Sequence, residues 1–493
     1  MNRKQRRAAD DKAGKLFMLA QEHQKAGRLG EAKDLYKKVL TIHPNHPPTL
    51  HLLGVIALQT GALGPARGLI EQALRFDPNL AGARADLCNV LIKMGDFEAA
   101  RESLQNTIKK FPNLTSAYSN LGYVLHKLNE FGEARMWCER AISIDPTFAE
   151  AHAVLGGVFL RLGKPDEARK SFARTLALRP GDAASRYNFG LAALTLGDFA
   201  EGWKGYEARR ETKEYAANIR SHRQPYWDGS PLDGRTILLH AEQGAGDGIQ
   251  MLRYVKMVSD RGGKIVLEIQ PALAPLAASI KGVEHVVPRG ETLPEIDVYA
   301  SLMSLPYLFE TTLDTIPDDV PYLGVNDPSD IIDIGRSDKF KVGFVWAGDP
   351  TQENNRNRSV DVAHFARLVD VPGTQFFSLQ VGAAESDLSA TDFAGNVTAL
   401  GPKLSDYNLT ASAINQLDLV ISVCTSVTHL AGAMAKPVWT LLSFAPDFRW
   451  LLDREDSPWY PTMRLYRQPK MGDWEAVFTE VSRELKKLVS GAK

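Results

Sequence analysis

The stretch GGVFLRLGKPDEARKSFARTLALRP, residues 156–180, contains the pattern that decides the fold of the N-terminal part of the chain. It holds two short segments with helical spacing of apolar residues, separated by Gly163 and closed by Pro180. A glycine lets the chain leave a helix through the left-handed conformation, and a proline cannot continue one. The stretch therefore predicts a pair of short amphipathic helices.

The pattern recurs every 34 residues from about residue 13 to residue 210, in six copies. The recurring positions are the closing prolines Pro44, Pro78, Pro112, Pro146 and Pro180; the turn residues Gly27, Gly61, Gly95, Asn129, Gly163 and Gly197; small residues of the first helix, Ala20, Gly54, Cys88, Gly122, Gly156 and Gly190; and small residues of the second, Ala32, Ala66, Ala100, Ala134, Ala168 and Gly202. Four positions that keep one period argue against a helical bundle with accidental spacing. The period resembles that of the tetratricopeptide repeat (TPR), which implies an all-α superhelical solenoid.

Such a solenoid has a concave face that suits an extended peptide or a partner helix, so we expect a protein or peptide partner there. The last copy carries aromatic residues at Trp203 and Tyr206. Because a terminal repeat lacks a neighbour on one side, we expect these side chains to pack on the region that follows.

Composition sets outer limits. The chain has 493 residues, 44% of them hydrophobic, which suffices for two or three domains. Its net charge of −1 offers no bulk attraction to nucleic acid or an anionic membrane. No segment reaches the roughly 18 apolar residues of a transmembrane helix. The three cysteines lie far apart, which excludes a disulfide framework and a CxxC metal site. A cytoplasmic location is the simplest expectation.

Beyond residue 222 the pattern changes to short apolar runs that alternate with helical segments. The runs are residues 237–240, 265–268, 286–287, 342–346, 376–379, 419–423 and 438–442. This alternation predicts parallel sheets in an α/β region. A polar, aspartate-rich stretch at 326–339 separates two groups of runs, which predicts two Rossmann-like halves, 222–330 and 338–490, the second ending in a helix over 474–487.

Ligands in such sheets bind beyond the carboxyl ends of the strands. The first loop at such a place is Ala241-Glu242-Gln243-Gly244-Ala245-Gly246-Asp247-Gly248, before a predicted helix over 249–258. Its glycines would let the backbone approach a ligand at a helix N-terminus. Asp247 is equally well explained as a helix cap.

Two further loops follow strands of the second half. In the one over 346–359, Arg358 could bind phosphate or carboxylate oxygens; the alternative is a solvated loop whose Ser359 starts a helix around 363–369. In the other, hydroxyls and free N–H groups at Thr425 and Ser426 favour a diphosphate. His429 lies one turn inside the helix, where a histidine is more often packed than catalytic.

The segment from Trp227 to about Leu485 resembles the glycosyltransferase domain related to the lipopolysaccharide heptosyltransferases. The matching stretches are residues 227–235, 242–254, 345–359, 422–437 and 453–461. The resemblance implies a two-Rossmann-domain (GT-B) glycosyltransferase fold, with the acceptor on the first half and the nucleotide-sugar donor on the second. With the repeats before it, the chain resembles bacterial tetratricopeptide-glycosyltransferase proteins.

The resemblance also implies roles for particular residues. Asp247 would be the base that deprotonates the acceptor hydroxyl, and Gln243, Gly244 and Gly246 would form the acceptor-side loop. The donor-side residues would be Arg358, Cys424, Thr425, Ser426 and His429. Inversion at the anomeric carbon would follow from one direct displacement, without a metal or another cofactor.

At Cys424 the sequence departs from the family, whose members carry Asp-Thr where this chain has Cys-Thr. A thiol does not accept hydrogen bonds as a carboxylate does, so either the donor differs or the activity has weakened. Three hypotheses remain open. The chain is a transferase whose repeats recruit a protein acceptor, an adaptor with a degenerate transferase domain, or a transferase of surface-polysaccharide assembly.

Overall fold

The computed structural model describes residues 3–326, 332–352 and 354–491. The chain divides into two compact units, one of residues 1–159 with 177–180, the other of residues 160–176 with 181–493. The predicted boundary between the two α/β halves, at residue 330, lies outside the described residues, as does part of the polar stretch assigned to it.

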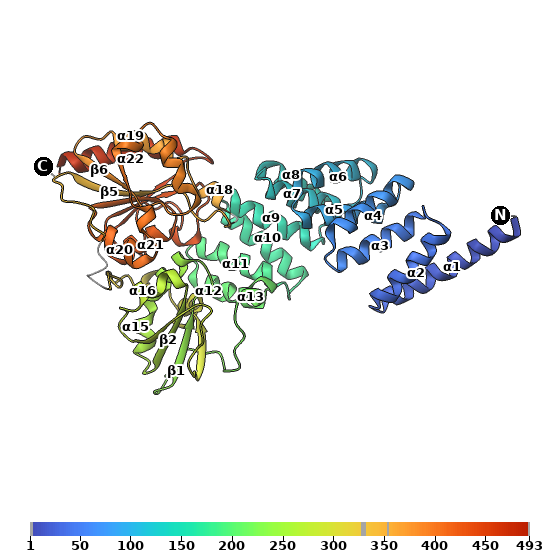
Figure 1. The fold of residues 1–493 in the computed structure, drawn as a ribbon, viewed down its shortest axis with the longest axis horizontal. Helices are drawn as coiled ribbons and strands as arrows, with labels where there is room; N and C mark the ends of the chain where they lie inside the picture. The colour runs from blue at the N-terminus through green and yellow to red at the C-terminus, as the bar shows by residue number, and fades with distance from the viewer. Residues whose placement is uncertain (1–2, 327–331, 353, 492–493) are drawn as a thin grey trace. The chain divides into compact units, whose positions relative to one another are not determined.

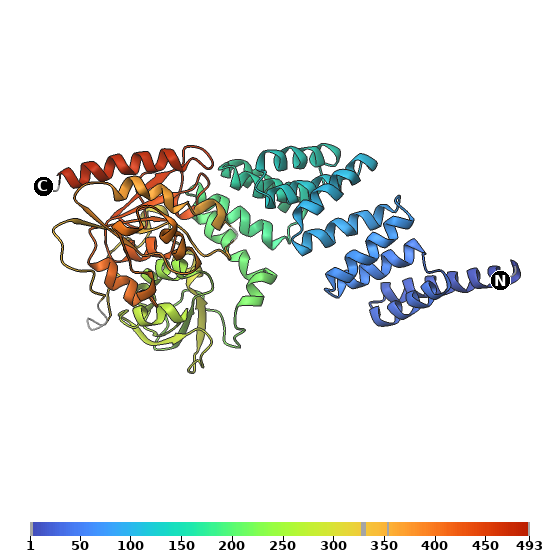
Figure 2. The ribbon, with the colours of Figure 1, turned by 45° about the horizontal axis from the view of Figure 1, so that its top comes forward.

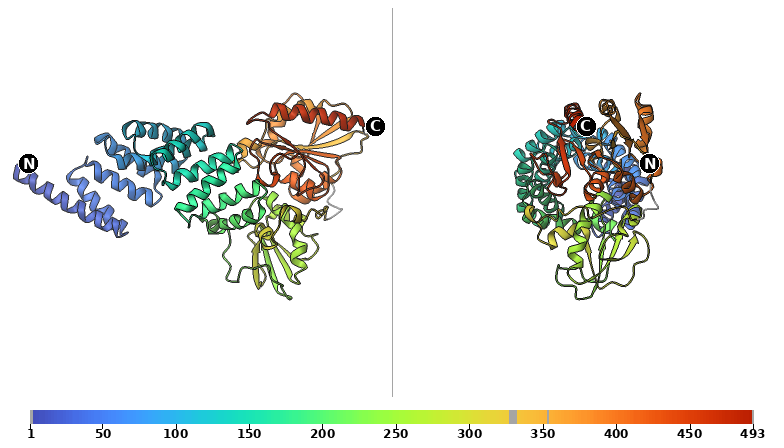
Figure 3. Two further views of the ribbon diagram at one scale, coloured as in Figure 1. Left: turned by 180° about the vertical axis from the view of Figure 1, so that it is seen from behind. Right: turned by 90° about the vertical axis from the view of Figure 1, so that its left-hand side faces the viewer.

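Twelve helices make up the N-terminal part of the described chain (Figure 1). Their bounds are α1 Arg3–Lys25, α2 Leu29–Ile42, α3 Pro47–Gln59, α4 Leu63–Phe76, α5 Ala81–Met94, α6 Phe97–Lys110, α7 Thr115–Lys127, α8 Phe131–Ile144, α9 Ala149–Arg161, α10 Pro165–Leu178, α11 Ala183–Thr195 and α12 Phe199–Tyr206. The pairs follow one another in chain order, from blue to green in Figure 3. Helix α1 begins ten residues before the predicted start of the array, because the segment before residue 13 is rich in Ala, Arg and Lys, which are good helix formers.

The predicted repeat register is confirmed. All six turn residues, Asn129 included, have positive φ, between 64° and 80°. The alanines of the second helices are fully buried. A Cβ atom at Gly54 would lie 2.5 Å from Cγ1 of Ile70, and one at Gly122 would lie 2.4 Å from Sγ of Cys138. The small residues are therefore what permits the two helices of a pair to approach.

The last copy packs on the α/β region, as its aromatic residues predict. The ring centroid of Trp203 lies 5.7 Å from that of Phe448 and 6.5 Å from that of Trp459. Tyr206 lies 5.9 Å from Phe448. After α12 the chain continues through a 3₁₀ helix, Glu207–Glu211, and α13, Lys213–Asn218, before the first strand.

Two sheets follow, and within the described residues their strands pair in parallel. The first has the order β3-β2-β1-β4, the second β10-β9-β8-β5-β6-β7. The strands are β1 Thr236–His240, β2 Lys264–Ile269, β3 Val283–Pro288, β4 Val298–Ser301, β5 Phe340–Val345, β6 Thr374–Ser378, β7 Val397–Ala399, β8 Leu419–Val423, β9 Val438–Leu442 and β10 Met463–Arg467. The predicted α/β region with parallel sheets is confirmed.

Sequence reasoning missed β4, β7 and β10, and all three are edge strands. Strand β7 has three residues, two of them exposed, and β10 carries arginines at positions 464 and 467. Edge strands are short and charged because this discourages pairing with other chains. The continuous apolar run that marks a central strand is therefore absent from β7 and β10, whereas β4 has the short apolar run Val298-Tyr299-Ala300.

Helices cover the sheets and position the loops. The helices α14 (Ala245–Met251), α15 (Val255–Ser259) and α16 (Ala274–Ala277) pack on the first sheet. On the second sheet, α19 (Ala366–Val369) and α22 (Trp474–Gly491) share one apolar core with the strands; Figure 2 shows α22 along the outside. The helices α20 (Tyr407–Asn415) and α21 (Ser426–Ala433) pack in the core that the first sheet shares.

Candidate functional site

The first and third predicted loops lie against each other. A Cβ atom at Gly246 would lie 2.9 Å from Cδ2 of His429 and 3.4 Å from Cα of Ser426. Only a glycine lets α14 approach α21 this closely. The structure thus brings the Asp247 loop of the first sheet beside the N-terminus of α21 on the second, as the sequence predicts for loops at the carboxyl ends of parallel strands.

The helix after the first loop begins earlier than predicted, at Ala245 instead of Ile249. Asp247 therefore lies in the first turn of this helix; residues 241–248, which comprise the loop and that first turn, are called the Asp247 loop below. Its Oδ2 accepts a hydrogen bond of 2.9 Å from the backbone N–H of Gly244. This bond satisfies a donor at the helix start, so the capping interpretation of Asp247 holds whatever further role the carboxylate has.

Arg449 is the main partner of Asp247, and sequence reasoning did not find it. Its Nη2 pairs with Oδ1 of Asp247, its Nε donates to Oε1 of Gln250, and its Nη1 lies 2.7 Å from Asp447. The Arg449 side chain is only 6% exposed. Arg449 belongs to the 3₁₀ helix Phe448–Trp450 and follows Asp247 by 202 residues, so no local sequence pattern predicts this pair.

Burial raises the pKa of Asp247, and the positive charge of Arg449 opposes that shift. A carboxylate with a raised pKa binds a proton more readily than an exposed one. Its bonds to Gly244 and Arg449 leave acceptor capacity unused, since an ionised carboxylate has about four lone-pair positions. Asp247 can therefore accept a proton from a group placed beside it.

The second predicted loop contains a single helical turn, α18, Asn355–Arg358. Nη1 of Arg358 donates 3.2 Å to the backbone oxygen of Cys424, so the second and third loops meet. A Cβ atom at Gly348 would lie 2.5 Å from Nη2 of Arg358. Arg358 therefore packs directly on the Gly348 backbone.

Ser359 does not start the next helix, contrary to one predicted alternative. Its Oγ accepts from the N–H of Gly348 at 3.2 Å and donates to Asn355 at 3.0 Å. The cap is Asp361, which accepts from the N–H of Ala363 at 2.9 Å. A carboxylate is a stronger cap than a hydroxyl that is already bonded elsewhere.

At the third loop, Thr425 is the N-cap of α21, and its side chain makes no capping hydrogen bond. Its hydroxyl lies 3.0 Å from that of Ser422. The Ser426 hydroxyl accepts from Tyr407 at 2.7 Å. Because the side chain of the N-cap does not satisfy them, the first N–H groups of α21 remain suitable for an anion.

Cys424 is held as a neutral thiol. The indole Nε1 of Trp450 donates to its Sγ at 3.2 Å. Burial raises the pKa of the thiol to about 11, so a thiolate does not form near neutral pH. The position therefore offers no negative charge to a ligand.

His429 is packed, as the sequence alternative proposes. Its Nδ1 lies 3.0 Å from the hydroxyl of Tyr460, and its ring stacks on Trp450 with centroids 5.3 Å apart. The residue is 6% exposed, and burial lowers its pKa well below the usual value. His429 is thus neutral and positions α21 against the neighbouring aromatic residues.

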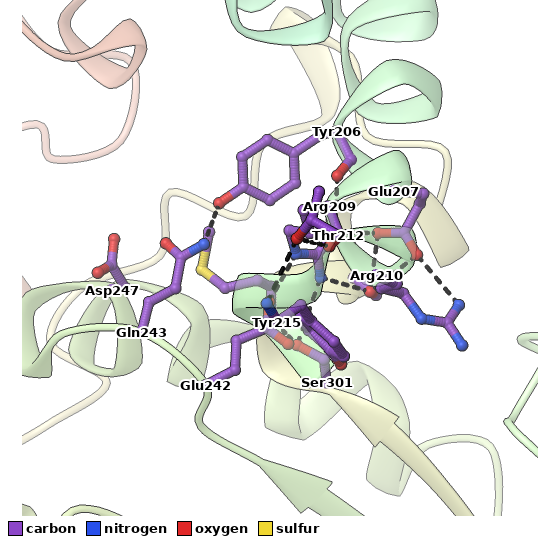
Figure 4. Close-up of polar contacts among 12 residues, drawn as sticks. Tyr206, Glu207, Arg209, Arg210, Thr212, Tyr215, Glu242, Gln243, Asp247 and Ser301 are labelled. Atoms are coloured by element: carbon purple, nitrogen blue, oxygen red, sulfur yellow. Dashed lines mark hydrogen bonds and ion pairs between the residues drawn. The ribbon is translucent and has the colours of Figure 1, made fainter. Parts of the chain in front are cut away.

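The loop over residues 241–248 contacts the last repeat (Figure 4). Nε2 of Gln243 donates 2.7 Å to the hydroxyl of Tyr206, and Glu242 lies 2.6 Å from Arg209. From the other side, Gln270 donates 2.6 Å to the backbone oxygen of Gln243. The end of the last repeat thus contacts the loop that carries Asp247 through Tyr206 and Arg209.

Among the residues that the structure describes, no group of three or more His, Cys, Asp or Glu side chains is arranged to hold a metal ion. None of the described helices is both long enough and apolar enough to cross a membrane.

Comparison with protein families identifies tetratricopeptide repeats at residues 23–81, 86–147 and 154–209. The N-terminal region is therefore a tetratricopeptide solenoid, a kind of structure that binds proteins and peptides. Protein FlbA of Caulobacter vibrioides (strain ATCC 19089 / CIP 103742 / CB 15) is 24% identical over 320 residues, a match that covers 59% of this chain and 53% of FlbA. The chain thus spans about half the length of that relative.

The solved structures with similarity to part of this chain include the following two. MamA from Desulfovibrio magneticus RS-1 is 23% identical, covers 35% of this chain and 98% of its own, and has a TM-score of 0.33. TTC0263, a thermophilic TPR protein of Thermus thermophilus, is 22% identical, with coverage of 37% and 99% and a TM-score of 0.32.

Proposed function

We propose that the chain is a nucleotide-sugar-dependent, inverting glycosyltransferase whose tetratricopeptide repeats recruit a protein acceptor. The observation that carries the proposal is the close approach of two different elements. Gly246 brings the partly exposed carboxylate of Asp247 beside the N-terminus of α21, whose first N–H groups suit a diphosphate. The resemblance to the heptosyltransferase-related domain supports the same reaction.

In the proposed reaction Asp247 accepts the proton of the acceptor hydroxyl as the oxygen attacks the anomeric carbon. The bond between the anomeric carbon and the diphosphate oxygen breaks on the opposite face, so the configuration inverts. The raised pKa of Asp247 favours proton acceptance. Its bond to Gly244 and its pair with Arg449 fix the direction of the carboxylate.

The leaving nucleoside diphosphate gains negative charge, which the second half would stabilise. The N–H of Ser426 belongs to the third loop, and Arg358 belongs to the second. The two loops meet where Nη1 of Arg358 donates to the backbone oxygen of Cys424. Donors fixed before the reaction stabilise developing charge without reorganisation. Thr425 would add its hydroxyl.

Cys424 bears on the choice of donor. A neutral thiol bonded to Trp450 cannot accept the hydrogen bonds that a carboxylate would take from sugar hydroxyls. We therefore propose a donor sugar that differs from those used where an aspartate stands at this position. The same observation favours a second candidate function, a repeat adaptor whose transferase region no longer acts.

A donor panel tests the proposal. The full chain is incubated with nucleotide sugars that vary in base and sugar, and mass spectrometry follows both hydrolysis of the donor and mass gain on co-purifying proteins. Hydrolysis or transfer with one donor class is the expected result. Absence of both, with no nucleotide bound, would favour the adaptor. Transfer to a glycan and not to a protein would support the role in polysaccharide assembly.

A further inference from the structure

We infer that Arg209 is a positioning residue for the loop that carries Asp247, so that the end of the repeat array is a structural part of the candidate site. The expected effect of Arg209 on catalysis rests on the proposed function. That Arg209 holds the loop in place does not depend on which reaction the chain performs.

Arg209 makes an unusually complete set of contacts for one side chain (Figure 4). Its Nε donates 2.6 Å to Glu242, its Nη1 donates 2.6 Å to Glu207 and 3.1 Å to the backbone oxygen of Tyr206, and its Nη2 donates 2.8 Å to Ser304. The side chain is 5% exposed. The guanidinium thus links the end of the array, the loop that carries Asp247 and the segment after β4.

Stability alone is a poor explanation for this arrangement. The Glu242 side chain is 2% exposed, and among the described residues its Oε2 has no hydrogen-bond partner. Removing two charges from water is costly, and an apolar pair of similar size is often as stable or more so. What the arginine adds is orientation: Nη1 and Nη2 are bonded to Glu207 and Ser304, so the guanidinium is fixed, and its Nε holds Oε1 of Glu242 at a defined place.

Residues 242, 243 and 244 connect Arg209 to Asp247, and each of them is held by a hydrogen bond or an ion pair. Glu242 is held by Arg209, and Gln243 is held by Tyr206 through its side chain and by Gln270 through its backbone. The next N–H, that of Gly244, donates to the Asp247 carboxylate. A displacement of the loop at residue 242 would therefore move the group proposed to accept the proton.

Arg210 supplies a matched control one residue further along. It is 32% exposed, its guanidinium lies 3.4 Å from the ring centroid of Tyr226, and it pairs with Glu207 at 3.4 Å. Both arginines therefore pair with Glu207 in the same 3₁₀ helix, but the bond to the Asp247 loop belongs to Arg209.

The experiment compares Arg209→Met, Arg210→Met and the double variant Arg209→Met/Glu242→Gln in the full chain. The double variant removes the unpaired buried charge and so separates a loss of loop position from a loss of stability. Hydrogen exchange of residues 243–251 reports on the loop, and kcat and KM for the donor report on the reaction.

We expect faster exchange of 243–251 in both Arg209 variants, with kcat lowered about tenfold to a hundredfold and donor KM within about twofold, because a displacement of about 1 Å suffices for such a loss. Arg210→Met should leave exchange and kcat within about twofold of the wild type. Wild-type exchange and kcat in the double variant would overturn the inference.

The two proposals fail in different ways. If the wild-type chain transfers no sugar, the proposed function fails, and the exchange of 243–251 still decides whether Arg209 positions the loop. If Arg209→Met does not fold, Tyr206→Phe replaces it, since this change removes only the hydroxyl that accepts from Gln243. Faster exchange in Tyr206→Phe would support a loop held by the array, and unchanged exchange would contradict it.

Discussion

The repeat array and the candidate site differ in the sequence separation of the contacts that hold them together. In the array a contact such as Gly54 on Ile70 joins residues 16 positions apart, and equivalents of it recur along the array, as at Gly122 and Cys138. In the candidate site Asp247 and Arg449 are 202 positions apart and occur once. A repeated local solution can be recognised from spacing, whereas a single long-range pair becomes visible only when the chain is folded.

The largest effect should come from Asp247→Asn, which tests the candidate site, where the long-range pair occurs once. The amide keeps the size of the side chain but cannot accept the proton, so we expect transfer to fall about 10²-fold to 10⁴-fold while donor affinity stays nearly unchanged. Steady-state kinetics and calorimetry measure the two quantities. The control is Asp456→Asn, an exposed carboxylate paired with Arg454 within its own loop. Turnover that survives Asp247→Asn would remove Asp247 from the role of base.

Gly190→Ala tests whether close helix approach is the shared rule of the array. A Cβ atom there would lie 2.5 Å from the backbone N of Tyr206, which cannot move independently of its helix. We expect the free energy of unfolding to fall by about 3 kcal/mol, the upper end for overpacking. At Gly54 the nearest atom, at 2.5 Å, belongs to the side chain of Ile70 and not to the backbone, so Gly54→Ala should cost less, about 1–2 kcal/mol. Chemical denaturation ranks the two, and an equal cost would count against the explanation.

Two buried histidines of the α/β region, His240 and His429, predict a pH dependence of stability. Burial lowers the pKa of His240 to about 3 and that of His429 well below its usual value. Both stay neutral in the folded chain, while the unfolded chain takes up protons below about pH 6.5. As the pH falls by about one unit below that value, the free energy of unfolding should therefore fall by about 1.4 kcal/mol per histidine. Urea denaturation of His240→Asn against the wild type checks this: the variant should show a shallower slope, and an unchanged slope would exclude His240 as a contributor.

The smallest effect concerns the turn glycines. Gly27 has a φ of 75° and nothing within 4 Å of an added Cβ, so Gly27→Ala should lower stability by about 1 kcal/mol through backbone strain alone. Gly68, inside α4, also has open space around it, so Gly68→Ala should raise stability by about 0.5–1 kcal/mol. Thermal unfolding distinguishes the opposite signs. The same sign in both variants would mean that the turn conformation is not what the repeat requires.

Much of the fold could be predicted because its signals are local. The six turn residues, the central strands and the loops at their carboxyl ends all follow from spacing or from apolar runs. The start of α14 could not be placed, because Gly244, Gly246 and Gly248 lower the helix propensity of a segment that packing against α21 nevertheless makes helical. Arg209 and Arg449 could not be assigned either, since nothing in the sequence around them indicates the distant carboxylates, Glu242 and Asp247, with which they pair.

We propose that the loops at Arg358 and at the start of α21 bind a nucleoside diphosphate. Calorimetric titration of the full chain with uridine, adenosine, guanosine and thymidine diphosphates tests this proposal. We predict that one of them binds with a dissociation constant between about 1 μM and 1 mM, the range of ordinary substrates, and that Arg358→Met weakens this binding about tenfold. Absence of heat with all four at millimolar concentration, in a chain whose thermal unfolding is intact, would contradict the account.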